Sequence, residues 1–281
     1  MQRETFDAAI DFIAFTPAHG LASREAFRDV GHFIHTSTVT TFGEEFDWLP
    51  VTEDHPARAT NPYGINKASI DRMYMAAYFA DAFPVTIIKP STTYGRKRIV
   101  RQLGIDTRWF RRIREGRPIL KVGEGNAIHH LLHVDDAAPA FAGALERNRT
   151  IGQDYILVNP EHTTWAEVHD TAMKVLGREV DQVSVPADVL YDIDPQRFML
   201  VPGVLAVNLL FSSAKLQRDV PEFQPRLSLY DGLSDAVEYL ERNGLIEEVP
   251  PGDWEDQIVD IQRSARTKIL GLRGSIPGLS R

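Results

Sequence analysis

The chain has 281 residues, of which 43% are hydrophobic and 25% are charged, so it has enough apolar material for one large domain or two interleaved domains. Its 31 basic and 39 acidic residues give a net charge of −8, which argues against nucleic acid or an anionic membrane as the main partner. The absence of cysteine excludes disulfides, thiolate metal sites and cysteine nucleophiles, and it fits a reducing compartment.

The sequence predicts neither a membrane span nor a signal peptide. The longest apolar run, residues 200–211, is broken by proline and glycine and falls far short of the roughly 20 residues that span a bilayer. Residues 1–7 lack the basic-then-apolar order of a signal peptide. We therefore expect a cytoplasmic protein that binds neither nucleic acid nor membrane.

Three apolar stretches in the first third of the chain predict strands. They comprise residues 6–15, 33–39 and 85–88. Their near-continuous apolar character is typical of a parallel sheet covered on both faces. Helical patterns at residues 21–30 and 62–82 separate them, with Asn61 suited to cap the second helix and Pro62 to its first position. The β-α-β-α-β order predicts a doubly wound α/β domain.

From about Ser91 the pattern is less regular and predicts a smaller α/β domain that interleaves with the first. Helices are expected near 105–115, 136–147, 164–176, 213–218 and 227–243, and strands near 119–122, 155–158 and 182–185. We assign residues 1–90, with parts of 130–160 and 180–215, to the first domain and most of 91–250 to a lid over the substrate. Residues 251–281 are expected to form a C-terminal helix, at about 254–269, and a tail.

The sharpest local signal is a tyrosine followed four residues later by a lysine at the start of the second predicted helix, Tyr63 and Lys67. A spacing of four places both side chains on one helical face. A tyrosine with an ordinary pKa of about 10 is a poor base at neutral pH, but a neighbouring ammonium group stabilises its phenolate. The pair predicts a general acid/base. The alternative is a pair of surface side chains.

Five stretches, in order over about residues 6–240, point to a known family. They are 6–15, 33–43, 61–67 (NPYGINK), 89–95 (KPSTTYG) and 123–136. Through them the chain resembles the extended short-chain dehydrogenase/reductases, the NAD-dependent sugar epimerase/dehydratase family. The resemblance implies a Rossmann-like sheet, Tyr63 as the acid/base, Lys67 on the nicotinamide ribose and Thr38 on the reacting hydroxyl. For Thr38 the alternative is a strand-end threonine whose hydroxyl is satisfied by the backbone.

The resemblance also implies a cofactor, NAD or NADP, and a small polar substrate such as a nucleotide sugar. The cofactor-binding residues would be Ala14, Thr36, Tyr63, Lys67, Pro90 and Thr92. The substrate-binding residues would be Thr38, Thr92, Arg98, Arg101 and His129. Members of the family often form homodimers through the helix that corresponds to residues 62–82, so we expect a homodimer.

One departure from the family concerns the glycines. None of the 19 glycines forms G-x-x-G-x-x-G or G-x-G-x-x-G, the turns that bind a pyrophosphate at a helix N-terminus. Residues 6–15 resemble the family's fourth strand, so the predicted fold is an incomplete Rossmann-like sheet that leaves an apolar edge open. The dinucleotide site would be incomplete in this chain alone, and a second copy or another subunit would cover the edge.

A second departure concerns charge near the substrate. The segment from Arg96 to Arg117 contains nine basic and two acidic residues, a local charge of +7. Such a segment could bind phosphate or carboxylate groups of a substrate, or it could be a solvated helix face or a subunit contact. His129 and His130 stand where the family often has Arg-Asp, and a mostly neutral imidazole grips a diphosphate less well.

The same region could be interpreted as a metal site. Alternate strand positions place His129, His133 and Asp135 on one face. The resemblance instead implies that His133 is structural and that Asp135 or Asp136 caps the following helix. We therefore expect no metal.

The residues after Thr38 narrow the reaction. Family dehydratases carry an acidic pair there, whereas this chain has Val39 and Thr40, so dehydration is disfavoured. The serine-hydrolase, zinc-protease and P-loop motifs are absent. We predict an NAD(P)-dependent epimerase or reductase that acts on a secondary alcohol of an activated sugar or similar substrate. The alternatives are a fold relative without its own dinucleotide site, acting as a partner subunit or in cofactor-free acid/base chemistry, and a fragment that would aggregate through its open edge.

Overall fold

The computed structural model describes residues 6–145 and 147–272, and the chain divides into two compact units whose segments alternate along the sequence. Unit 1 comprises residues 1–95, 128–163 and 208–228, and unit 2 comprises residues 96–127, 164–207 and 229–281. Residues 180–207, part of which the sequence analysis assigned to the first domain, lie in unit 2. Residues 273–281 of the predicted tail lie outside the described residues.

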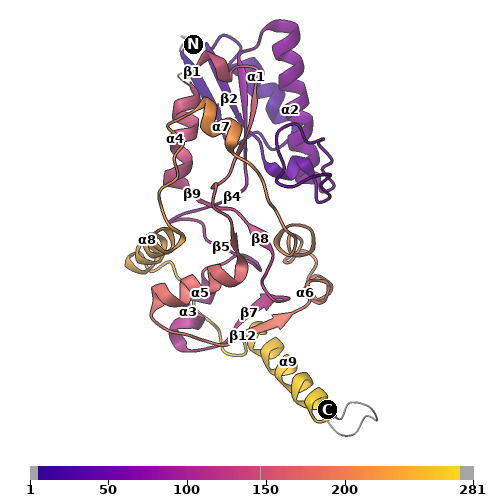
Figure 1. The fold of residues 1–281 in the computed structure, drawn as a ribbon, viewed down its shortest axis with the longest axis vertical. Helices are drawn as coiled ribbons and strands as arrows, with labels where there is room; N and C mark the ends of the chain where they lie inside the picture. Colours follow the sequence, from indigo (N-terminus) through magenta and orange to yellow (C-terminus); the bar gives the residue numbers. More distant parts are fainter. Residues whose placement is uncertain (1–5, 146, 273–281) are drawn as a thin grey trace. The chain divides into compact units, whose positions relative to one another are not determined.

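Unit 1 is built on a four-stranded, all-parallel sheet with the order β1-β2-β3-β10 (Figure 1). The strands are β1 (Ala8–Asp11), β2 (His32–Thr36), β3 (Val85–Pro90) and β10 (Asp154–Leu157). Ile10 lies beside Ile34, and Ile34 lies beside Thr86. The predicted α/β fold with a parallel sheet is confirmed, and helices make the connections that parallel strands require.

Helices cover both faces of this sheet (Figure 1). The helices α1 (Pro17–Ala26) and α2 (Pro62–Asp81) lie on one face, where Phe33 and Val85 pack against Tyr74 of α2. The helices α4 (Val134–Leu145) and α7 (Ala214–Asp219) lie on the other face, where Ile34 and Ile88 pack among their side chains. Successive residues of a strand point to opposite faces, so one strand supplies both cores.

Local caps decide where these elements begin and end. Helix α2 begins at Pro62 as predicted, because Asn61 Oδ1 accepts a hydrogen bond from the backbone N–H of Gly64. Helix α1 begins four residues before its predicted start, because Thr16 caps it and Pro17 occupies its first position. Strand β1 ends early because Asp11 Oδ1 accepts hydrogen bonds from the backbone N–H groups of residues 13 and 14.

Short elements complete unit 1. They are the 3₁₀ turns η1 (Val39–Phe42) and η2 (Asn148–Thr150) and the strands β4 (Thr92–Tyr94), β8 (Ile128–His129) and β9 (Leu131–His133), while β11 (Thr163–Thr164) lies at a sequence border between the units. Strands β4 and β9 pair in parallel.

The two edges of the sheet differ. At β10, Glu53 accepts a hydrogen bond from the Ile156 N–H at 2.8 Å and Lys215 Nζ donates one to the Asp154 carbonyl at 2.9 Å. These contacts occupy backbone groups that a further strand would need. No described strand pairs with the outer side of β1, and Phe12, Ile13 and Phe15 just after it are 53%, 73% and 48% exposed. The open edge therefore lies at β1.

Unit 2 contains a parallel pair, β7 (Ile119–Val122) with β12 (Gln182–Val185), and an antiparallel pair, β5 (Val100–Arg101) with β6 (Gly104–Ile105). Its helices are α3 (Arg108–Glu115), α5 (Trp165–Leu176), α6 (Ala187–Ile193), α8 (Leu229–Arg242), α9 (Trp254–Leu270) and a π-helical turn, η3 (Val201–Leu205). Helix α6 and η3 were not predicted. None of the helices in the described part of the chain has both the length and the apolar character of a membrane span.

The positively charged segment from Arg96 to Arg117 is neutralised within unit 2. Seven of its nine basic residues form ion pairs with carboxylates. These pairs are Arg96 with Asp235, Arg101 with Asp106 and Glu255, Arg108 with Asp253, Arg111 with Glu248, Arg112 with Asp253 and Asp256, Arg114 with Glu241, and Arg117 with Glu115 and Asp256. The segment was expected either to bind anions or to form a solvated helix face or subunit contact. For most of its residues, binding of a free anion is wrong, because carboxylates of unit 2 already occupy them.

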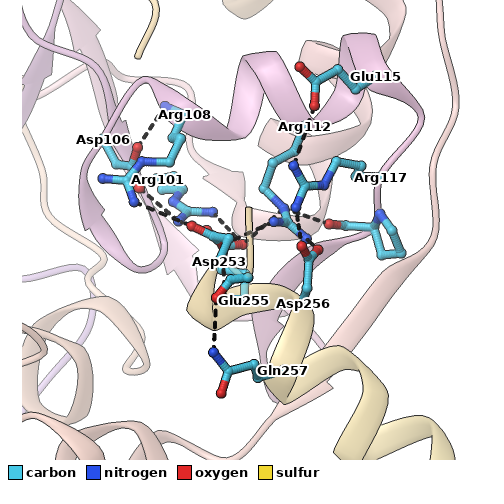
Figure 2. Close-up of polar contacts among 12 residues, drawn as sticks. Arg101, Asp106, Arg108, Arg112, Glu115, Arg117, Asp253, Glu255, Asp256 and Gln257 are labelled. Atoms are coloured by element: carbon cyan, nitrogen blue, oxygen red, sulfur yellow. Dashed lines mark hydrogen bonds and ion pairs between the residues drawn. The ribbon is translucent and has the colours of Figure 1, made fainter. Parts of the chain in front are cut away.

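The centre of these ion pairs is buried (Figure 2). Arg112 is 0% exposed and contacts Asp253 at 3.1 Å, Asp256 at 2.7 Å and the Pro118 carbonyl at 2.8 Å. Arg101 contacts Glu255, which is also 0% exposed, at 2.5 Å. The start of α9 is therefore held to α3 and β5 by charge.

We expect Glu255→Gln to destabilise unit 2 by about 3 to 5 kcal/mol, because it leaves the Arg101 guanidinium buried with one counter-charge fewer. Urea unfolding followed by tryptophan fluorescence measures this, since Trp109, Trp165 and Trp254 all lie in unit 2. The control is Glu248→Gln, whose carboxylate is 79% exposed and pairs with Arg111 at the surface. Equal midpoints for the two variants would contradict the importance of the buried pair.

Candidate active site

The carboxyl ends of β1, β2 and β3 lie at one edge of the unit 1 sheet, where open parallel sheets bind ligands. Five of the predicted site residues lie in or directly after these strands. They are Ala14 after β1, Thr36 as the last residue of β2, Thr38 just beyond it, Pro90 as the last residue of β3 and Thr92 at the start of β4. The sheet thus brings together side chains that are up to 78 residues apart in sequence.

Lys67 joins α2 to this edge. Its Nζ donates a hydrogen bond to the Thr36 carbonyl at 2.6 Å and lies 5.0 Å from the centroid of the Phe15 ring. The side chain is 1% exposed, so it is not a surface residue. Burial lowers the pKa of Lys67, opposed by the charges of Asp71 and Asp11. The ammonium group is thus held at the strand ends in surroundings that weaken its grip on the proton.

Tyr63 lies in the first turn of the same helix. It is 43% exposed, and its ring centroid is 6.4 Å from that of Phe15. Phe15 therefore contacts both members of the predicted pair: the ammonium group of Lys67 lies over its ring face, and the ring of Tyr63 packs beside it. The tyrosine is accessible to a ligand and the lysine is buried behind it.

Thr38 is 7% exposed and caps the turn η1. Its Oγ1 accepts a hydrogen bond from the Thr40 N–H at 3.2 Å and lies 3.1 Å from the Thr40 hydroxyl. This local capping is the structural alternative foreseen for Thr38. A contact between this hydroxyl and a substrate stays a prediction.

Gly64, which the sequence analysis did not single out, fixes how closely η1 approaches α2. A Cβ atom at Gly64 would lie 2.7 Å from the Thr40 carbonyl oxygen and 3.0 Å from the Ala59 Cβ. Both are too short for a real contact with atoms that have little freedom to move. The glycine beside Tyr63 therefore lets the turn that Thr38 caps pack against the start of α2.

Buried polar atoms without a protein partner mark the same edge. Among the described residues, Asp11 Oδ2, Thr36 Oγ1 and Ser91 Oγ have no hydrogen-bond partner. They follow or end three neighbouring strands. Buried polar groups are normally satisfied, so water or the polar groups of a ligand are expected here.

Two of the residues that were predicted to bind substrate lie in surroundings that do not favour it. The Arg101 guanidinium is buried and held by Glu255 and Asp106, and the His129 side chain is 0% exposed in β8. Arg98 is exposed and makes no ion pair with a described carboxylate, and its contact with substrate stays a prediction. The Arg101 guanidinium is thus already occupied by carboxylates, and a contact of Arg101 or His129 with substrate would require a rearrangement that this structure does not show.

His130 explains the replacement of Arg-Asp in structural terms. Its Nε2 accepts a hydrogen bond from the Phe211 N–H at 3.0 Å, so its Nδ1 carries the proton and donates to the Asn159 carbonyl at 2.7 Å. Burial lowers the pKa of His130, which keeps the ring neutral. His133 Nδ1 accepts from the Asp135 N–H, and the described residues contain no group of three or more side chains placed to hold a metal ion.

We expect Gly64→Ala to lower the melting temperature of the protein, because the added methyl group forces η1 away from α2 at a cost of about 1 to 3 kcal/mol. Circular dichroism measures the transition. The control is Gly20→Ala in α1, where alanine favours the helix and the new Cβ would meet side-chain atoms alone, the flexible end of Met73 at 2.9 Å and Ile70 at 3.1 Å, rather than a backbone carbonyl. If the two variants melt alike, the packing of η1 on Gly64 is not a tight constraint.

Comparison with known proteins identifies relatives of this chain. The model of the NAD dependent epimerase/dehydratase family matches residues 13–158. The 2'-dehydrokanamycin reductase of Streptomyces kanamyceticus is 29% identical over 78% of this chain and 62% of its own length. A dTDP-glucose 4,6-dehydratase from an Actinoplanes species is 23% identical over 76% of this chain and 61% of its own length. The chain thus spans about three fifths of the length of these curated relatives.

Solved structures share the fold. The UDP-glucuronic acid 4-epimerase of Bacillus cereus, solved with UDP-glucuronic acid and NAD, superposes with a TM-score of 0.66 at 21% identity, covering 80% of this chain and 67% of that one. RMD from Pseudomonas aeruginosa, solved with NADPH, gives a TM-score of 0.67 at 17% identity, covering 84% and 82%. With the family model matching more than half of its residues, this chain belongs to the NAD-dependent epimerase/dehydratase family.

Proposed function

We propose that this chain carries the acid/base half of the active site of an NAD(P)-dependent reductase or epimerase for sugar-type substrates. The observation that carries the proposal is the placement of Lys67 and Tyr63, one buried against the end of β2 and the other exposed in the same first turns of α2. Tyr63 would give a proton to, or take one from, the oxygen of the reacting secondary alcohol. Lys67 would stabilise the phenolate form of Tyr63, and Thr38 would bind the same substrate oxygen.

The residues present fit the nicotinamide-ribose end of a dinucleotide. The unsatisfied oxygens of Thr36 and Ser91 lie where parallel sheets bind ligands, and Ala14, Pro90 and Thr92 line the same strand ends. Lys67 would bind the ribose hydroxyls. The nicotinamide, when bound, supplies or accepts the hydride.

The pyrophosphate end has no matching cradle in the described residues. The connection from β1 to α1, Phe12 to Thr16, contains no glycine, and no glycine-rich turn follows β2 or β3. A second copy, another subunit or further polypeptide at the open edge of β1 would have to supply these contacts. This observation also supports the rival proposal, a partner subunit that binds no dinucleotide.

The substrate class follows from the relatives and from two local features. The relatives are named as enzymes that act on sugar-type compounds. They include a 2'-dehydrokanamycin reductase and a UDP-glucuronic acid 4-epimerase. Thr38 is followed by Val39 and Thr40 rather than by acidic residues, which supports reduction or epimerisation over dehydration. The neutral His130 has no charge with which to bind a diphosphate.

Fluorescence titration of the purified chain with NADH and NADPH tests whether the chain binds a dinucleotide at all. We expect saturable binding at about one site per chain, and no binding at millimolar cofactor would overturn the proposal in favour of the partner subunit.

A substitution then tests the acid/base. Tyr63→Phe should lower turnover of a keto-sugar by at least about a hundredfold with cofactor affinity nearly unchanged, because the proton donor is lost. Tyr78→Phe, a tyrosine farther along the same helix, serves as the control. Full activity in Tyr63→Phe would contradict the assignment.

A further inference from the structure

A row of buried charges lies behind Lys67 in unit 1. Asp71 follows Lys67 by one helical turn and is 8% exposed. Its Oδ2 accepts a hydrogen bond from Ser37 Oγ at 2.8 Å and lies 3.7 Å from Lys89 Nζ of β3. Lys89 contacts Asp154 of β10 at 2.5 Å, and Asp154 lies 3.6 Å from Lys215. Positive and negative groups thus alternate from α2 across the sheet to its β10 edge.

Two contacts from helix α2 fix the residues that precede Thr38. Lys67 binds the carbonyl of Thr36, and Asp71 binds the hydroxyl of Ser37. The Ser37 N–H also donates to the Ile88 carbonyl at 2.7 Å, so this residue is tied to β3 and to α2 at once. Consecutive residues at the end of β2 are therefore held by consecutive turns of the helix that bears Tyr63.

The electrostatic surroundings of Asp71 are unusual for a carboxylate with cationic neighbours. Burial raises its pKa to about 6, although Lys89, Ser37 and Lys67 lower it and Asp154 adds to the rise. His35 of β2 lies 3.5 Å away, and burial, with Lys67 and Lys89, lowers its pKa to about 3 against the opposing charge of Asp11. His35 is thus neutral at pH 7, when Asp71 carries its charge.

We propose that Asp71 is a positioning residue, whose carboxylate holds Ser37 and balances the ammonium group of Lys67 so that Thr38 and Lys67 keep the places that cofactor and substrate require. The proposal rests on the proposed function. Protonation of Asp71 removes the negative charge nearest to Lys67 and Lys89 on α2, while Asp11 of β1 and Asp154 of β10 remain. At neutral pH Asp71 therefore carries the charge that this arrangement uses, and in mild acid it does not.

The test compares Asp71→Asn with Asp81→Asn, an exposed acid at the end of the same helix that pairs with Arg24. Both are titrated with NAD⁺ from pH 5.5 to 8, with quenching of tryptophan fluorescence as the readout. The wild type and Asp81→Asn should bind up to about fourfold more weakly at pH 5.5 than at pH 7.5, the limit for one group with a pKa of about 6, whereas Asp71→Asn should bind weakly and without this pH dependence. Asp71→Glu, which restores the charge, should recover the pH dependence. Parallel curves for wild type and Asp71→Asn would overturn the proposal.

A second variant keeps the test decisive if Asp71→Asn does not fold. Ser37→Ala removes only the hydroxyl that Asp71 accepts from, so it should weaken NAD⁺ binding and leave the pH dependence in place. Unchanged binding in Ser37→Ala would refute the role of this hydrogen bond in holding the end of β2.

A measurement without cofactor separates this proposal from the proposed function. Hydrogen exchange of residues 36–43 at pH 7.5, where Asp71 is ionised, should be slow in the wild type and in Asp81→Asn and faster in Asp71→Asn. If this pattern is seen but the wild type binds no NAD⁺, the dinucleotide function alone is overturned. If the wild type binds NAD⁺ but the pattern is absent, the role of Asp71 alone is overturned.

Discussion

A buried ammonium group needs an acceptor for its protons and a nearby negative charge, and the site is arranged around that need at Lys67. The Thr36 carbonyl supplies the acceptor, and Asp11 and Asp71 supply the charge from β1 and from α2 itself. Meeting these demands draws the ends of β1 and β2 against the first turns of α2. Tyr63, one turn earlier on the same helix, is thereby placed at the strand ends with its ring accessible. The position of the proposed acid/base is a consequence of how the lysine is buried.

The open edge of β1 bears on the other half of the reaction. The sheet ends at β10 with its backbone groups occupied by Glu53 and Lys215, whereas β1 leaves them to a partner. Three aromatic or aliphatic side chains just beyond β1 are largely exposed, and a protein surface seldom leaves such a cluster uncovered. Pairing at this edge would extend the sheet beside the very strand ends where Thr36 Oγ1 and Asp11 Oδ2 lack partners. Cofactor binding and coverage of the edge are therefore expected to be coupled.

Sequence patterns predicted the parts of this structure that depend on neighbours along the chain. Asn61 and Pro62 located the start of α2, and the spacing of Tyr63 and Lys67 placed both residues in its first turns, while their acid/base role stays a prediction. The patterns failed where a partner lies far away in sequence. The charge of Arg101 seemed available to a ligand because Glu255, which neutralises it, is 154 residues farther on. The contact of Gly64 with Thr40 and that of Asp71 with Ser37 likewise depend on how η1 and β2 pack on α2, which no local pattern encodes.

The buried ion pairs of unit 2 and the buried charges around Lys67 in unit 1 differ in how well each charge is balanced by its neighbours. In unit 2 the arginines lower the pKa values of Asp106 and Asp256 despite burial, so each charge is better satisfied in the folded protein than its burial would suggest. At Lys67 and Asp71 of unit 1 burial prevails instead, since the pKa of Asp71 is raised and that of Lys67 is lowered, and neighbouring oxygens lack partners. Among Lys67, Asp71 and Lys89, only Lys89 has a pKa that its neighbours shift toward the charged form. A fold gains no stability from leaving charges so poorly matched, and apolar residues of similar size would often serve it better. Such mismatch is typical of sites that must hold or release a proton. The poorly matched charges of Lys67 and Asp71 thus support the proposed chemistry at Tyr63.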